Sequence, residues 1–287
     1  MKKILLTPNP YRDCDFSAAA QAAELLRAQG VETVCFLPFL PEGVPLPPLP
    51  APQVELEDAL EDVDMVICFG GDGTILHMAK NAALHNKPIL GVNMGSMGFI
   101  ADMEVPDLPL LAGLPAGKYR TEARMMLDVS VLRHGQQVFH ELALNDAVLT
   151  KGSVVRVLDL SVAADNIEMM HFRGDGIIVC TPTGSTAYSM SAGGPIIEPT
   201  SRNILITPIC AHTILARPFV LNGESCVSIR VPALGRKAVH LSVDGGADFP
   251  LGAEDELRIR RAALETTLVR IRNRSFYETV NQKLCET

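Results

Sequence analysis

The segment Met65-Val66-Ile67-Cys68-Phe69-Gly70-Gly71-Asp72-Gly73-Thr74 gives the clearest indication of how the first part of the chain folds. Its first five residues are apolar, as in a strand that is buried on both faces of a sheet, and the glycines after them predict a tight turn. The residues that follow predict a helix from Thr74 to about Leu84. A glycine-rich turn between a strand and a helix presents backbone N–H groups and the positive end of the helix dipole, and this arrangement favours binding of a phosphate.

Asp72 is the unusual residue in this loop. A carboxylate beside a phosphate site must either bind a metal ion or accept a proton. The alternative is a tight strand–helix turn in which Asp72 only caps the helix. Other phosphate-binding loops are excluded, because the chain has neither a G-x-x-x-x-G-K-[ST] sequence nor the His-Arg-Asp set of protein kinases.

Strands alternate with helices on both sides of this loop. We expect strands at 3–6, 31–37 and 89–93, and helices at 17–29, 55–61 and 106–116. This alternation predicts a mostly parallel sheet covered by helices, an α/β domain. Seven prolines between Pro38 and Pro52 predict an extended surface loop within that domain, with an interdomain linker as the alternative.

From Arg124 onward the hydrophobic period changes to two, as in Leu127, Val129 and Val131. Further short strands are expected at 154–162, 176–180, 227–231, 239–243, 256–260 and 267–272. These strands predict an antiparallel, sandwich-like all-β domain. We therefore expect an α/β domain at 1–120 and a β-rich domain at 121–273, with a tail helix at 275–284 that packs back on the first domain.

The composition is that of a folded protein, with 47% hydrophobic and 20% charged residues among 287. The net charge of −8 argues against a nucleic-acid partner. No apolar run approaches the roughly 20 residues of a membrane helix, so we expect no membrane partner. The seven cysteines are scattered without metal-binding spacing, so we expect mostly buried thiols and a soluble cytoplasmic protein.

The glycine loop resembles the Gly-Gly-Asp-Gly-Thr signature that NAD kinases share with diacylglycerol and sphingosine kinases. Later segments are similar to the NAD kinases, in the same order along the chain: Leu90–Asn93 with Gly98-Phe99, Leu144–Ala147, Gly174–Gly176 with Thr181–Gly194, Ile206–Thr213 with Arg217-Pro218, and Ser242–Gly245. One departure is Gly246, where the family often has Gln. On these segments the chain is identified as a member of the NAD kinase family, of the bacterial ATP- or polyphosphate-dependent type.

The resemblance implies a phosphotransferase with an alcohol acceptor. It would move a phosphoryl group from ATP, or another donor, to the 2′-hydroxyl of the adenosine ribose of NAD, giving NADP and ADP. Asp72 would be the general base, and Gly70, Gly71, Gly73 and Thr74 would hold phosphates. The divalent cofactor would be Mg²⁺ carried by ATP, with no metal site in the protein itself.

The expected NAD-binding set spans most of the chain. Asn145 and Asp146 offer an amide and a carboxylate that suit a ribose diol or an adenine edge, with an Asx turn as the alternative. Tyr188 offers a flat face for stacking, with a buried structural tyrosine as the alternative. The complete set is Asp72, Gly73, His77, Asn145, Asp146, Arg156, Arg173, Asp175, Thr183, Thr186, Ala187, Tyr188, Ser189, Met190, Ser191 and Ala247.

Several roles in this set remain open. Arg173 and Arg156 would counter the phosphates of the dinucleotide, although a solvated strand residue is an equal reading of Arg156. His77 could reach the site or be structural, and His212 and Arg217 suit a structural or interface role. The resemblance places Asp175 on NAD, from a neighbouring subunit in a homodimer or homotetramer. A lipid kinase and a non-catalytic NAD(P) sensor are the rival functions.

Overall fold

The computed structural model describes the chain except residues 42, 44, 96–97, 153–156, 232–237 and 286–287. The chain forms two compact units, of which the first contains Met1–Ala123 with Thr266–Thr287 and the second contains Arg124–Glu265. The predicted boundaries are 120/121 and 273/274. The C-terminal helix lies within Thr266–Thr287 and so belongs to the first unit.

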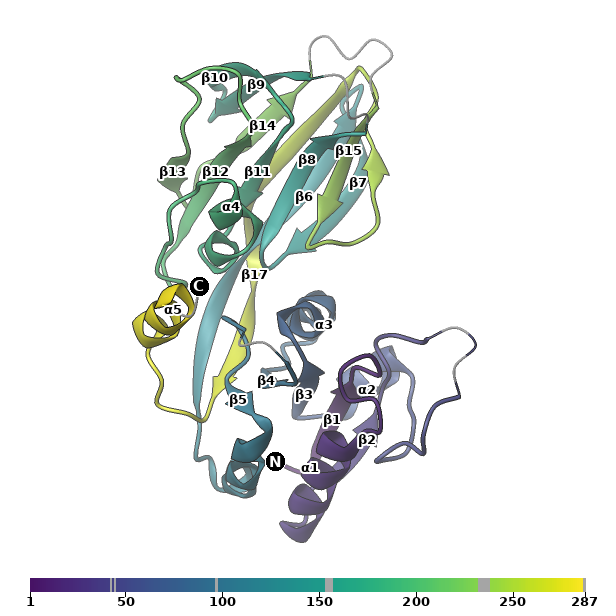
Figure 1. The fold of residues 1–287 in the computed structure, drawn as a ribbon. Helices are drawn as coiled ribbons and strands as arrows, with labels where there is room; N and C mark the ends of the chain where they lie inside the picture. The colour runs from purple at the N-terminus through teal and green to yellow at the C-terminus, as the bar shows by residue number, and fades with distance from the viewer. Residues whose placement is uncertain (42, 44, 96–97, 153–156, 232–237, 286–287) are drawn as a thin grey trace. The chain divides into compact units, whose positions relative to one another are not determined.

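The first unit is built on parallel strands (Figure 1). Its sheet has the order β17-β4-β3-β1-β2, and β5 pairs with β4. The strands are β1 (Lys3–Pro8), β2 (Glu32–Cys35), β3 (Met65–Gly70), β4 (Ile89–Asn93) and β5 (Met103–Glu104), joined at the end by part of β17 (Asp255–Arg270). The pairs β1–β2, β1–β3, β3–β4, β4–β5 and β4–β17 of this sheet are all parallel, which confirms the predicted α/β class.

The helices of the first unit are α1 (Ser17–Ala28), α2 (Leu56–Asp62), α3 (Asp72–Leu84) and α5 (Phe276–Cys285). Residues of α1 pack with the strands in one apolar core that includes Ile4, Ile67 and Leu90. The segment Val105–Ala116, predicted as a helix, is a 3₁₀ helix. Pro109 and Pro115 lie inside it and cannot donate the backbone hydrogen bonds of a regular α-helix.

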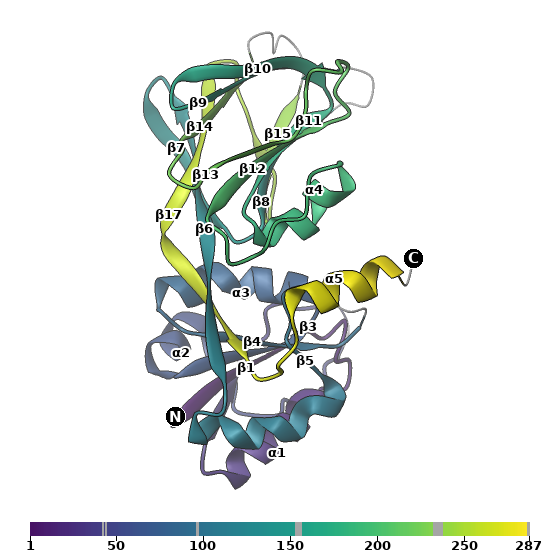
Figure 2. The same cartoon turned by 90° about the vertical axis from the view of Figure 1, so that its left-hand side faces the viewer.

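The second unit consists of two antiparallel sheets packed face to face (Figure 2). One sheet contains β6 (Arg120–Arg133), β7 (Gln136–Ala143), β9 (Leu158–Ala164), β10 (Ile167–Gly174), β14 (Val227–Arg230) and β17. The other contains β8 (Asp146–Lys151), β11 (Gly176–Cys180), β12 (Asn203–Ile209), β13 (Phe219–Asn222), β15 (Val239–Val243) and β16 (Phe249–Pro250). Side chains of both sheets, such as Val129 and Leu149, share one core. This arrangement confirms the sandwich-like domain.

Two long strands carry the chain from one unit to the other. β6 contains the boundary at Ala123/Arg124, and β17 contains the boundary at Glu265/Thr266. The sequence predicts two separate strands, at 256–260 and 267–272, but the structure has the single strand β17. No linker composition marks either boundary, because each boundary lies inside a regular strand.

The described cysteines are free thiols. Cys35, Cys68 and Cys180 are buried, and burial raises the pKa of each thiol to about 12. Cys14 and Cys210 are exposed, so the prediction of mostly buried thiols holds for part of the set. Within the described residues, no helix has the length and apolar character needed to cross a membrane.

Candidate functional site

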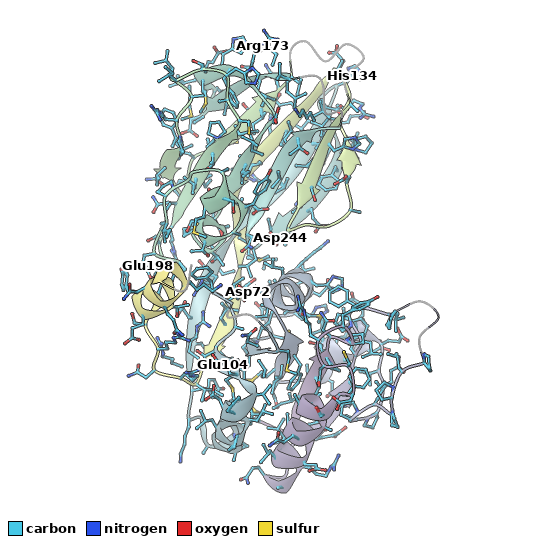
Figure 3. All side chains as sticks on the ribbon, in the orientation of Figure 1. Asp72, Glu104, His134, Arg173, Glu198 and Asp244 are labelled. Atoms are coloured by element: carbon cyan, nitrogen blue, oxygen red, sulfur yellow. The ribbon has the colours of Figure 1, made fainter. Side chains whose placement is uncertain are left out.

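The glycine loop lies at the carboxyl end of β3, next to the end of β4. Gly70, the last residue of β3, pairs with Asn93, the last residue of β4. Asp72 is the first residue of α3, so the helix begins two residues before the predicted start at Thr74 (Figure 3). The prediction placed the start too late because the glycines lower helix propensity, although they are tolerated in the first turn. The loop therefore occupies the edge of the sheet where α/β folds bind ligands.

Three consecutive backbone N–H groups hold the Asp72 carboxylate. Phe99 N–H donates to Oδ2 at 2.7 Å, and the N–H groups of Ile100 and Ala101 donate to Oδ1 at 3.1 and 3.2 Å. Gly98 makes this approach possible, since a Cβ at that position would overlap the carboxylate. A carboxylate has about four acceptor positions, so Asp72 keeps room for roughly one further donor or for a cation.

The other residues of the glycine loop differ in how much free space surrounds them. A Cβ added at Gly71 or Gly73 would meet no described atom within 4 Å, so both positions border open space. Thr74 is buried, and its hydroxyl accepts a hydrogen bond from the Asn9 amide at 3.0 Å. Binding of phosphate by Gly70, Gly71, Gly73 and Thr74 remains a prediction.

His77 lies one turn further along α3 and packs against the Phe39 ring, with ring centroids 4.8 Å apart. Burial lowers the pKa of the His77 imidazole, which favours its neutral form. The Phe39 contact gives this histidine a packing role, and its contact with NAD remains a prediction.

In the second unit, one carboxylate holds the Asn145-Asp146 segment. Asp244, at the end of β15 (Figure 3), accepts hydrogen bonds from the backbone N–H groups of Leu144, Asn145 and Asp146 at 2.6, 2.8 and 2.9 Å. The Asn145 side chain is buried, and its Oδ1 has no hydrogen-bond partner among the described residues. A buried acceptor without a partner costs about 1–3 kcal/mol, so this oxygen is suited to receive a donor from a ligand.

The two acidic side chains of this segment affect each other. Burial, and secondarily the charge of Asp244, raises the pKa of the Asp146 carboxyl to about 7. Burial also raises the pKa of Asp244 to about 6, while the three backbone N–H donors oppose that rise. Those donors favour the ionised form of Asp244, so Asp146 is the member of the pair that keeps a proton toward neutral pH.

The hydroxyl-rich segment after β11 uses most of its hydroxyls internally. Thr183 Oγ1 accepts a hydrogen bond from the buried Arg124 at 3.2 Å, and the Thr186 hydroxyl donates to the Thr183 carbonyl. Ser189 is fully buried and shares a 2.7 Å hydrogen bond with Thr207. A hydroxyl has one donor and two acceptor positions, so Thr183 can still donate to a ligand and Thr186 can still accept from one. Binding of NAD by these hydroxyls remains a prediction.

The remaining members of that segment are more open to solvent. The Tyr188 side chain is 44% exposed in the short helix α4 (Tyr188–Ser191), so the alternative of a buried tyrosine is wrong. Ser191 is exposed, and Ala187 and Met190 are half-buried. Ala247 is exposed in the turn between β15 and β16. Tyr188 is thus the ring in this segment that is available for stacking on a base.

Asp175 and Arg173 lie at the other end of the second unit from Asp146. Along the antiparallel pair β8 and β11, Asp146 faces Cys180, while Thr150 faces Gly176. At about 3.3 Å per residue, this register separates Asp175 from Asp146 by roughly 15 Å. The Asp175 carboxylate forms a 2.5 Å ion pair with Lys151. Figure 3 likewise shows Arg173 far from Asp244. The structure therefore divides the predicted NAD-binding residues of this unit into two groups.

Arg156, a further predicted NAD-binding residue, lies outside the described residues. His212 and Arg217 line a cavity of about 540 Å³ together with Cys210 and Ile214. The His212 backbone N–H donates to the Arg173 carbonyl at 2.7 Å. This cavity is therefore close in the fold to the Arg173–Asp175 group.

Sequence reasoning missed three residues at these sites. Asp244 was noted only as part of a matching segment, and its role of holding the 144–146 backbone had no local signal. Arg124 is buried beside Thr183, although its position next to an apolar run gave a partial signal. Lys283 lies over the Phe99 ring, with its Nζ 3.9 Å from the ring centroid, and nothing near it in the sequence pointed there.

Comparison with protein families adds a direct result. The model of the ATP-NAD kinase N-terminal domain matches residues 52–113, and the model of the ATP-NAD kinase C-terminal domain matches residues 144–271. The first range contains Asp72 and the 98–101 segment. The second contains both groups of predicted NAD-binding residues.

Similar proteins agree over the full length. The NAD kinase of Symbiobacterium thermophilum is 40% identical over 288 residues, covering all of both chains. The NAD kinase of Geotalea daltonii is 35% identical, covering 99% of this chain and 98% of its own. Among solved structures, yeast NADH kinase complexed with NADH has a TM-score of 0.84 at 24% identity, covering 99% of this chain and 88% of its own. An NAD kinase from Archaeoglobus fulgidus in complex with ATP has a TM-score of 0.75 at 22% identity, covering all of both chains. These two structures support the fold, and with the family models and the relatives they lead to one conclusion: the chain belongs to the NAD kinase family of phosphotransferases.

Proposed function

We propose that this protein transfers the terminal phosphoryl group of ATP to the 2′-hydroxyl of the adenosine ribose of NAD, giving NADP and ADP. The observation that carries this proposal is the fixed carboxylate of Asp72, at the carboxyl end of β3. The similar structures support the two substrates, since one was solved with NADH and the other with ATP. The buried thiols support a reducing compartment, which we take to be the cytoplasm.

Asp72 would act as the general base. A ribose hydroxyl is a weak nucleophile at neutral pH, and a positioned base contributes typically about 10²–10⁴ in rate. The N–H groups of residues 99–101 already fix the direction of the carboxylate, so it would need little reorganisation at the moment of reaction. Its remaining acceptor position would take the hydroxyl hydrogen bond.

Phosphates would bind at the N-terminus of α3. Gly71 and Gly73 have open space where a side chain would lie, so a phosphate could approach their backbone. The positive end of the α3 dipole would favour its negative charge. Phosphoryl transfer depends mainly on such positioning and on neutralisation of charge.

Mg²⁺ would enter with ATP and neutralise phosphate charge. The described residues contain no cluster of three or more His, Cys, Asp or Glu side chains arranged to hold a metal ion. Because the remaining acceptor position of Asp72 goes to the ribose hydroxyl, the ligands of this cation would be phosphate oxygens and water.

NAD would bind through the Asn145–Asp146 segment and Tyr188. The unpartnered Asn145 Oδ1 would accept from a ribose hydroxyl or an adenine amino group, and Asp146 would bind an adjacent hydroxyl. The exposed ring of Tyr188 would stack on a base.

The separate group at Asp175 and Arg173 would contact NAD that is held by another copy of the chain. The resemblance to the NAD kinase family is the reason for this proposal, and the separation of roughly 15 Å within one copy is compatible with it. Its test mixes Asp146→Ala chains with Asp175→Ala chains. If each copy supplies one group to its neighbour, the mixture regains NADP formation that neither variant shows alone. A monomer in solution, or an inactive mixture, would contradict the shared site.

The reaction itself is tested by incubating the protein with NAD and ATP and measuring NADP with an NADP-specific dehydrogenase. Phosphorus NMR of the product distinguishes a 2′-phosphate from a 3′-phosphate. We expect ATP-dependent formation of 2′-phosphorylated NAD, and parallel reactions with polyphosphate, NADH and diacylglycerol define donor and acceptor. The absence of NADP with every donor would refute the proposal.

A further inference from the structure

Lys283, on the C-terminal helix α5, places its ammonium group against the segment that holds Asp72. The Lys283 Nζ lies 3.9 Å from the centroid of the Phe99 ring, within the range of a cation–π interaction. Phe99 is also the residue whose backbone N–H makes the shortest of the three hydrogen bonds to Asp72, at 2.7 Å. A chain of two contacts therefore connects Lys283 to the Asp72 carboxylate.

The environment of Lys283 strengthens this connection. Its side chain is half-buried. Burial lowers the pKa of the Lys283 ammonium, and the negative charge of Asp72 opposes that change. Cation–π contacts gain strength when they are removed from water. A half-buried ammonium on this ring thus has a stronger hold than an exposed lysine would have.

Gly98 explains why such a hold is needed. The backbone of residues 98–101 approaches Asp72 so closely that a Cβ at Gly98 would overlap the carboxylate. Glycine permits this approach, but it also gives the backbone more conformational freedom than any other residue type would give it. An attachment at the adjacent Phe99 ring would reduce that freedom at the point where it matters for Asp72.

We propose that Lys283 is a positioning residue for phosphoryl transfer: its ammonium, seated on the Phe99 ring, fixes the 99–101 backbone whose N–H groups orient the Asp72 carboxylate. The proposal rests on the proposed function, in which Asp72 acts on the ribose hydroxyl. Lys283 acts through Phe99, so its loss would affect turnover more than substrate binding.

The kinetic test compares Lys283→Met, Lys283→Arg, Phe99→Leu and the double variant Lys283→Met/Phe99→Leu in the full-length protein. We expect Lys283→Met to lower kcat by about tenfold while KM for NAD and ATP stays within about twofold. Lys283→Arg keeps a cation on the ring and should retain most of the activity. The double variant should be no worse than the poorer single variant, because both remove the same contact. Lys118→Met, the same loss of charge at an exposed position of the first unit, is the control and should behave as the wild type.

Hydrogen exchange gives a readout that does not depend on activity. The backbone N–H groups of Phe99–Ala101 should exchange faster in Lys283→Met and at the wild-type rate in Lys283→Arg, with unchanged exchange in α1. Unchanged exchange at Phe99–Ala101 in Lys283→Met would overturn the proposal even if the wild type proved inactive. So would additive losses in the double variant, a rise in KM as large as the fall in kcat, or failure of Lys283→Arg to rescue. An inactive wild type would refute the proposed function alone, since the exchange result stands separately.

Discussion

Asp244 fixes the backbone of Asn145 across 99 residues of sequence, through a 2.8 Å hydrogen bond from the Asn145 N–H to Oδ1. The same carboxylate holds the N–H groups on either side, at Leu144 and Asp146. Asp72 does the same to residues 99–101 in the other unit. In both units a carboxylate therefore sets the backbone conformation of a distant segment that carries or supports the predicted site.

Replacing Asp244 with Asn should weaken NAD binding and stability together. Asn offers one acceptor oxygen and turns an N–H₂ group toward backbone donors, which leaves at least one buried N–H without a partner. The expected cost is about 1–3 kcal/mol in the free energy of unfolding, with a higher KM for NAD. Urea denaturation and steady-state kinetics measure the two effects. The control is Asp248→Asn, the same change at an exposed residue of the same turn. Equal stability and equal KM of the two variants would contradict the role of Asp244.

Replacing Asp146 with Asn should change how stability depends on pH. The pKa of Asp146 is raised from 3.8 to about 7, so the folded state binds this proton more tightly than the unfolded state does. The resulting stabilisation is fully present below pH 3.8 and is lost as the pH rises through about 7. The Asn variant lacks this titration and should gain on the wild type between pH 5 and pH 7, by at most about 1.4 kcal/mol per pH unit.

Urea denaturation of wild type and Asp146→Asn at several pH values from 5 to 8 measures this gain. Asp248→Asn, the same change at an exposed position, is the control. Parallel stability curves for Asp146→Asn and the wild type would show that Asp146 does not hold the extra proton.

Replacing Asp72 with Asn should abolish most turnover and spare binding. The amide cannot accept the hydroxyl proton, and it leaves at least one N–H group of residues 99–101 without its acceptor. We therefore expect kcat to fall by about 10²–10⁴. NAD affinity measured by calorimetry should change only a few-fold. The exposed Asp58 on α2 provides a control of the same chemistry. A kcat within about twofold of the wild type would refute Asp72 as the base.

Replacing Gly98 with Ala should displace the Asp72 carboxylate without altering its chemistry. The added Cβ would overlap the carboxylate oxygens, and a displacement of about 1 Å in a catalytic group can cost about 10² in rate. Gly95→Ala is the matched control, because its Cβ would make an ordinary contact, 3.5 Å from the Arg12 guanidinium. Steady-state kcat decides the prediction, and wild-type turnover in Gly98→Ala would show that this orientation of Asp72 is not the reactive one.

Replacing Tyr188 with Leu should weaken NAD binding while leaving the fold intact. Loss of a stacking partner is worth about 1 kcal/mol, which corresponds to a roughly fivefold rise in KM for NAD. The ring is 44% exposed, so the melting temperature should hardly change. Tyr11→Leu, at a residue 62% exposed, is the control. An unchanged KM would remove Tyr188 from the NAD site.

Signals within the sequence were enough to predict the fold class, the family and most of the elements. Five apolar residues before Gly70 predicted β3, and the alternation from Leu127 predicted the sandwich, because both signals lie within one element. Family motifs named Asp72, Asn145 and Asp146 from the residue types alone. The sequence did not predict that 105–116 is a 3₁₀ helix or that β17 is one continuous strand. Local secondary-structure propensity is a weak signal where tertiary packing determines the conformation.

The pairs of groups that bind one another become visible only in the folded chain. The Asp72 carboxylate meets the N–H group of Phe99 from 27 residues away, and Asp244 meets that of Leu144 from 100 residues away. The folded structure also shows that the Ser189 hydroxyl is hydrogen-bonded to Thr207. It places Asp175 at the opposite end of β11 from Cys180 and Asp146. Periodicity reports the environment of a residue within its own helix or strand, whereas these pairings depend on sheet register and on loops that meet only after the chain has folded.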